Sequence, residues 1–162
     1  MSQRYSTAGM FLCYAVEETK GTRPTSGYTK IPEIKSMPSF NPAPETIEST
    51  TLMETEYKTY VAGLKDLGGS LEYNANLTAD LITAWETCYN AHATAAESDK
   101  ATWFAVVHPN LTKAVFFQGE PSPLGLNAAE VGAMAETTLY ITPNSAPEWQ
   151  TKPTVTETVL GG

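Results

Sequence analysis

Apolar and polar residues alternate most regularly between residues 71 and 77. Every odd position of this stretch is apolar and every even position is polar, in the order Leu71-Glu72-Tyr73-Asn74-Ala75-Asn76-Leu77. A period of two is that of a β-strand with one buried and one solvated face. Residues 134–142 alternate in the same way, with Glu136 and Thr138 on the polar side. We therefore predict two strands that each present polar side chains to water.

Four further stretches have the composition of strands. Residues 10–16 and 101–107 are almost entirely apolar, which is typical of strands covered on both faces. Residues 114–120 follow a turn and are predicted to be the antiparallel partner of 101–107. A short strand is expected at residues 30–37, where Pro32 restricts it to an edge or a bulge.

The proline- and threonine-rich residues that follow predict a hairpin or a long extended flap. Residues 45–51 and 56–62 both have period-two character. Prolines 38, 42 and 44 separate this segment from the strand before it. We place the inserted flap at about residues 41–62.

One helix is predicted after Thr78, whose hydroxyl can cap it, with Asp80 in the first turn. The apolar stripe of this helix recurs every three or four residues and comprises Leu81, Trp85, Cys88, Tyr89 and His92. The alanine-rich end at residues 91–96 is expected to fray.

Together these elements predict a mainly β fold with seven or eight strands and one helix. The expected architecture is an antiparallel β-sandwich or small barrel flanked by an α-helix. The 162 residues suffice for one domain. We assign residues 1–143 to this domain and residues 144–162, rich in threonine and proline, to an extended C-terminal arm.

The charge of the chain narrows the classes of partner. Ten basic and eighteen acidic residues give a net charge of −8, which repels nucleic-acid phosphates and anionic lipid head groups. No apolar run is long enough for a membrane span, and residues 1–9 lack the order of a secretory signal. We therefore expect a soluble protein made in a cytoplasm, with no membrane partner and no tight nucleic-acid binding.

The residues that could carry chemistry give no catalytic signature. Cys13 and Cys88 lack metal-ligand spacing and are predicted to be buried thiols. His92 and His108 stand in no nucleophile motif and are interpreted as packing or turn residues.

Two sequence patterns resemble functional motifs only in part. Residues 63–70 have the spacing of a phosphate-binding loop, but Gly69 replaces the required lysine, which favours a glycine turn. Carboxylates are paired along the chain and are interpreted as solvated surface, namely Glu17 with Glu18, Glu45 with Glu48, and Glu54 with Glu56. We predict no catalytic residue, no cofactor and no metal.

Several stretches, in their residues and in their order along the chain, resemble the major tail tube proteins of siphophages and of related prophages. Siphophages are the bacteriophages with long, non-contractile tails. The resemblance covers roughly residues 7–143, and its most specific segments are residues 21–28 with 31–34, residues 50–52, residues 57–60 with 63–69, residues 100–104 and residues 117–122.

This resemblance implies a tail-tube fold and a structural role in the virion. Subunits of that family self-assemble into hexameric rings that stack into a hollow tube, the conduit for DNA ejection. It also implies tape measure, tail terminator and tail-tip proteins as partners, a location in the virion tail and assembly in the host cytoplasm. DNA would pass through the lumen without specific binding, which suits an acidic subunit.

Two sets of residues follow as candidates for this role. The polar sides of the two alternating strands would line the lumen, with Glu72, Asn74, Glu136 and Thr138 as candidates. The flap and the terminal arms would make contacts between rings, with the flap candidates Glu45, Glu48, Leu52, Met53, Tyr57 and Tyr60. The alternative is a carbohydrate-binding or adhesin-type β-sandwich, in which Trp149 is the tryptophan free to stack on a sugar.

Overall fold

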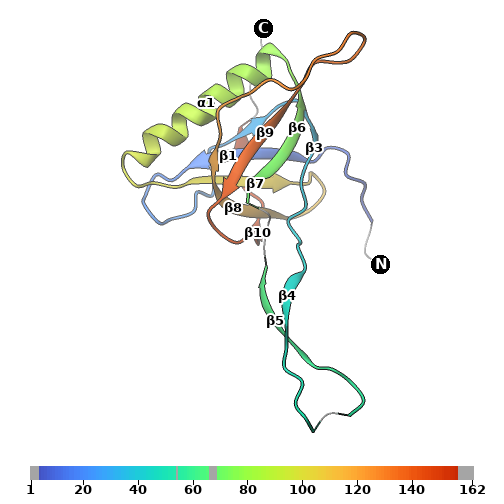
Figure 1. Ribbon diagram of the computed structural model, residues 1–162. Helices are drawn as coiled ribbons and strands as arrows, with labels where there is room; N and C mark the ends of the chain where they lie inside the picture. Colours follow the sequence, from blue (N-terminus) through green and yellow to red (C-terminus); the bar gives the residue numbers. More distant parts are fainter. Residues whose placement is uncertain (1–3, 54, 66–68, 157–162) are drawn as a thin grey trace.

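The structure is a computed structural model that describes residues 4–53, 55–65 and 69–156. These residues form eleven strands and one helix (Figure 1). In chain order they are β1 Phe11–Val16, β2 Tyr28–Ile31, β3 Ile34–Ser36, β4 Pro44–Glu48, β5 Tyr60–Lys65, β6 Leu71–Asn76, α1 Ala79–Ala96, β7 Thr102–Val107, β8 Lys113–Pro121, β9 Glu136–Pro143, β10 Glu148–Thr151 and β11 Val155–Thr156.

The main sheet curls into a half-barrel with the strand order β11-β2-β1-β7-β8-β9-β6-β3. All of its neighbouring strands are antiparallel except β11, which runs parallel to β2. The long strand β8 joins the two halves, because it pairs with β7 at residues 115–118 and with β9 at residues 119–121. The predicted architecture, mainly β with one flanking helix, is confirmed.

Gly119 lies where β8 passes from pairing with β7 to pairing with β9, and the packing there leaves no room for a side chain. A Cβ atom at Gly119 would lie 2.6 Å from the Cγ2 atom of Ile141 and 3.2 Å from the ring of Phe117. Both neighbours are fully buried, so neither can move aside without disturbing the core.

The strand predicted at residues 30–37 is instead two strands in different halves of the sheet. Strand β2 pairs with β1, whereas β3 pairs with β6. Between them lie Pro32, which cannot donate to a strand ladder, and Glu33, whose φ of 66° turns the chain sharply. The prediction of one strand is therefore wrong, because the proline marks a corner.

The core lies on both faces of the half formed by β1 and β7. Leu12, Tyr14, Phe104 and Val106 point into the larger cluster, which also receives β6, β9 and α1. The alternate residues of β1 and β7 enter a second cluster with Tyr28 and Phe116. All six residues of β7 are buried, as their apolar sequence predicts.

Helix α1 lies across one side of the half-barrel (Figure 1). The Leu81 backbone amide donates to the Thr78 hydroxyl at 3.2 Å, which confirms the predicted cap. Leu81, Trp85 and Cys88 are buried, but Tyr89 is exposed, so its inclusion in the apolar stripe is wrong. The helix continues through the segment predicted to fray and ends at Ala96.

Strands β4 and β5 form a separate two-stranded hairpin that extends well away from the body (Figure 1). Its residues pair as Thr46 with Ala62 and Glu48 with Tyr60. Residues 63–65, predicted as part of a glycine turn, belong instead to β5. Residues 66–68 of that stretch and Glu54 lie outside the described residues.

Candidate functional site

The polar residues of β6 and β9 share the face of the sheet that is turned away from the core. Asn74 pairs across the strands with Thr138, and Glu72 pairs with Tyr140. Glu136 lies on the same face beside Asn76. The structure therefore brings together the four residues predicted as lumen candidates.

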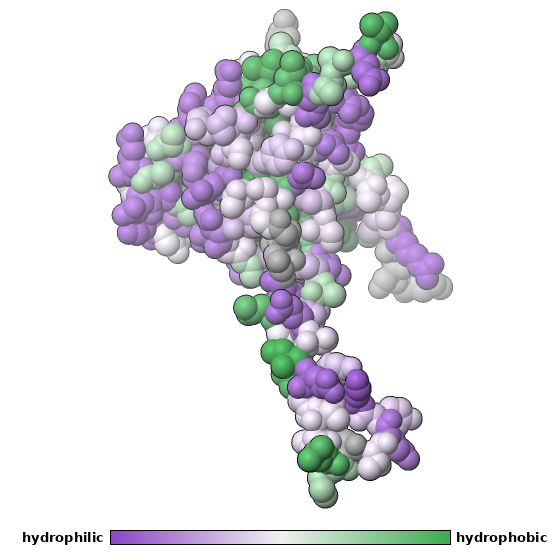
Figure 2. Space-filling model, in the orientation of Figure 1, coloured by the Kyte–Doolittle hydropathy of each residue, from purple (hydrophilic) through white to green (hydrophobic). Residues whose placement is uncertain are grey.

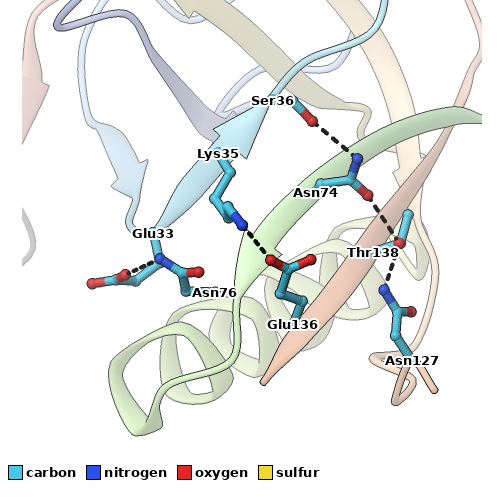
Figure 3. A network of polar contacts seen from close by, with 8 residues as sticks. All are labelled: Glu33, Lys35, Ser36, Asn74, Asn76, Asn127, Glu136 and Thr138. Carbon is cyan, nitrogen blue, oxygen red and sulfur yellow. Dashed lines mark hydrogen bonds and ion pairs between the residues drawn. The ribbon is translucent and has the colours of Figure 1, made fainter. Parts of the chain in front are cut away.

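Hydrogen bonds between side chains cross this face from strand to strand (Figure 3). The amide of Asn74 donates to Ser36 on β3 at 3.0 Å, and its carbonyl oxygen accepts from Thr138 on β9 at 3.1 Å. Asn127, from the β8–β9 connection, donates to the Thr138 hydroxyl at 3.1 Å. Each bond links a different element, so the face is held in one register.

The charges on this face are partly neutralised. Glu136 forms an ion pair with Lys35 of β3, and Asn76 donates to the Glu33 carboxylate at 3.3 Å. Glu72 is exposed, and no described residue is ion-paired with it. The face is therefore net negative, and Glu72 is an exposed carboxylate on it.

The β4–β5 hairpin forms the second candidate surface. All six residues predicted to contact another ring lie on it, and all are exposed. Leu52 is 103% exposed and Tyr57 is 80% exposed, although both are apolar. Further exposed apolar residues of the hairpin are Ile47, Met53, Tyr60, Val61 and Leu64.

Beyond the backbone pairing of β4 with β5, short polar side chains form hydrogen bonds within the hairpin. The Thr59 amide donates to the Thr50 hydroxyl at 2.9 Å, and the hydroxyls of Ser49 and Thr59 lie 3.1 Å apart. A two-stranded hairpin without a packed apolar face is marginally stable in water. This geometry leaves the apolar side chains available to a partner.

Glu17 is buried, so its interpretation as solvated surface is wrong. One carboxylate oxygen accepts from the backbone amides of Ala101 at 2.8 Å and Gly21 at 3.2 Å, and the other accepts from the Trp103 indole at 3.0 Å. Burial would raise the pKa of this carboxyl, but the three hydrogen bonds together outweigh it and lower the pKa. No sequence pattern marks this contact, because Trp103 is far away in the chain.

The remaining titratable candidates have structural roles. Burial raises the pKa of the Cys13 thiol to about 12, and Cys88 is equally buried, which makes both thiols inert. His92 is hydrogen-bonded to the Thr102 hydroxyl at 2.9 Å. His108 is bonded through Nε2 to the Ser6 carbonyl at 2.6 Å and accepts the Asn110 amide at Nδ1.

The described residues contain no group of three His, Cys, Asp or Glu side chains that could hold a metal ion. Within the same residues, no helix is long and apolar enough to cross a membrane. Glu45, Glu48 and Glu56 are exposed, as predicted for solvated carboxylates. Trp149 lies on β10 and is 61% exposed.

Eleven chains in solved structures match this chain. One of them is a chain in the cryo-EM structure of the anti-feeding prophage baseplate, symmetrised six-fold, with a TM-score of 0.58 and 11% sequence identity. The similarity covers 93% of this chain and 98% of that chain. No protein-family model matches the sequence, and no curated protein is significantly similar to it. At this identity the likeness establishes the fold.

Proposed function

We propose that the protein is a structural subunit of a phage-type tail, which self-assembles into stacked hexameric rings that form a tail tube. The observation that carries this proposal is the β4–β5 hairpin. It projects from a well-packed body and exposes apolar side chains along its length, from Ile47 to Leu64. A monomeric protein rarely maintains such a surface, whereas an assembly covers it.

Two other observations support the proposal. The polar, net-negative face of β3, β6 and β9 suits the wall of a channel that passes DNA without holding it. The chain of similar fold belongs to a six-fold symmetrised prophage baseplate, and six-fold symmetry is also that of a hexameric ring. In this role Glu72, Asn74, Glu136 and Thr138 would face the lumen.

The proposed partners follow from the same role. Copies of the chain would contact one another within and between rings, and the hairpin would bridge rings through Leu52, Met53, Tyr57, Tyr60, Glu45 and Glu48. Tape measure, terminator and tail-tip proteins would occupy the lumen and the ends of the tube. The protein would assemble in the host cytoplasm, remain in the virion tail and have no enzymatic activity.

Imaging of the purified protein by negative-stain electron microscopy tests this proposal. We expect tubes or six-fold rings at high protein concentration. Replacing residues 46–62 with a short Gly-Ser turn should leave a folded monomer, because the hairpin contributes no residue to either core cluster. Sedimentation velocity should show that this variant no longer polymerises.

Two results would contradict the proposal. Normal tubes from the hairpin-less variant would show that the hairpin is not an assembly contact. A wild-type protein that stays monomeric and binds a glycan through Trp149 would favour the carbohydrate-binding alternative.

A further inference from the structure

The connection between β8 and β9 forms a second exposed apolar surface. Within residues 122–135, three large apolar side chains contact nothing that covers them. Val131 is 106% exposed, and Leu126 and Met134 are also largely exposed. We name these three residues the loop patch.

The loop patch and the hairpin lie at opposite ends of the molecule. Figure 1 shows the β8–β9 connection as an orange loop at the top and the hairpin at the bottom. Green, apolar residues appear at both ends in Figure 2. The body of the subunit therefore separates the two apolar surfaces.

The base of the loop is fixed to the sheet by hydrogen bonds. The Ser122 amide donates to the Tyr140 carbonyl at 2.9 Å, and the Thr137 hydroxyl donates to the Gly125 carbonyl at 2.8 Å. Asn127 is bonded to Thr138. These contacts hold residues 122–127 along β9, at the base of the loop that carries the loop patch.

The placement of the two surfaces decides what kind of partner covers them. An interface between different surfaces of identical subunits repeats without limit when the two surfaces lie at opposite ends. One such contact would cover both the hairpin and the loop patch in every copy except at the ends of the stack. A foreign partner would have to cover each surface separately.

We propose that the hairpin of one copy docks on the loop patch of the next copy along the tube axis. This inference rests on the proposed function and names the surface that receives the hairpin. Leu52 and Met53 at the hairpin tip would pack against Val131 and Met134. The contact would be heterologous and would set the polarity of the tube.

Cysteine cross-linking tests this contact directly. The variant carrying Leu52→Cys and Val131→Cys should assemble and then be treated with a short bis-maleimide. Cys13 and Cys88 are both buried and should not react in the folded protein. We expect a ladder of covalent products that extends well beyond a hexamer on denaturing gels.

A matched control pairs Leu52→Cys with Glu86→Cys, because Glu86 is exposed on α1. This variant should give few cross-linked products. If the 52/131 variant forms tubes but gives no more cross-linked product than this control, the inference is overturned. The proposed tube formation would still stand. A ladder that stops at the hexamer would also overturn it, because the contact would then lie within one ring.

A second variant tests the loop patch without cysteines. Val131→Asp with Met134→Asp should keep the thermal unfolding midpoint of the wild type, because both side chains are exposed. It should lose assembly in sedimentation, whereas normal tubes would contradict the contact. If the wild-type protein itself forms no tube, the proposed function fails first, and the two failures are distinguishable.

Discussion

Glu17 shows how one buried carboxylate can organise several segments. It joins the end of β1 to the turn at Gly21 and to the start of β7 at Ala101 and Trp103. All three donors are N–H groups that would otherwise lack a described partner at these positions. The carboxylate suits the site because it offers only acceptors.

Glu17→Gln should therefore destabilise the protein by about 1–3 kcal/mol. A glutamine has one oxygen, so its NH2 group must face either the Trp103 indole N–H or the two backbone amides. Either orientation leaves at least one N–H donor without its acceptor. Urea unfolding measures the change, and Glu18→Gln at the exposed neighbouring position should have little effect.

The same residue predicts a dependence of stability on pH. Because its pKa is lowered in the folded state, the unfolded chain binds the proton more tightly. The stabilisation is present above the ordinary glutamate pKa and is lost as the pH falls through the lowered, folded-state pKa. The urea midpoints of wild type and Glu17→Gln should accordingly converge on acidification, and a constant gap would contradict the assignment.

Gly119 offers a second test at this scale. Gly119→Ala should cost about 1–3 kcal/mol, because the added methyl group meets the fully buried Ile141. Gly125→Ala is the control, since a Cβ atom there meets nothing within 4 Å. Equal unfolding midpoints for the two variants would show that β8 can shift freely at its crossing point.

At the scale of elements, helix α1 depends on one large side chain. Trp85 is fully buried in the larger core cluster, and its indole donates to the Ser122 carbonyl at 2.8 Å. This contact also ties the helix to the chain that leaves β8. Helix position and loop position are therefore linked.

Trp85→Ala should cost about 3–5 kcal/mol through the cavity it leaves. Trp85→Phe keeps most of the ring but leaves the Ser122 carbonyl without its donor, so a smaller loss of about 1–3 kcal/mol is expected. Tyr89→Ala, on the exposed side of the helix, should change stability little. A loss below about 1 kcal/mol for Trp85→Ala would contradict its place in the core.

At the scale of the whole molecule, the proposed lumen can be tested by changing the charge of the side chains that would line it. Glu72→Lys replaces an exposed carboxylate that has no ion pair among the described residues with a cation, whereas Glu136→Lys would also remove the partner of Lys35. Glu72→Lys is thus the cleaner change. Each added cation that faces DNA would make a salt-sensitive phosphate contact.

Virions with Glu72→Lys tubes should eject DNA more slowly than wild type at low salt, and high salt should reduce the difference. Glu86→Lys adds the same charge on the exposed side of α1 and should leave ejection unchanged. Ejection kinetics measured by release of a DNA-binding dye distinguish the two variants. Unchanged kinetics for Glu72→Lys would place this face on the outside of the tube.

Local patterns in the sequence predicted most of the elements. Periodicity predicted strands β6 and β9 and the polar side that carries Glu72 and Asn74. Residue propensity predicted the buried strand β7 and the helix cap at Thr78. Those signals are local, because the spacing of polar residues within a strand or helix indicates which of its faces is exposed. The four lumen candidates could therefore be chosen from the sequence as polar positions of two strands.

Only the tertiary structure decided which distant residues meet. The corner at Pro32 sends β3 to pair with β6 in the other half of the sheet. Trp103 buries Glu17, and Lys35 pairs with Glu136, although both pairs are far apart in the sequence. The loop patch opposite the hairpin is also a consequence of how the strands are ordered. Periodicity determines which face of an element is apolar, whereas topology alone determines what that face meets, because contacts between distant segments leave no local pattern in the chain.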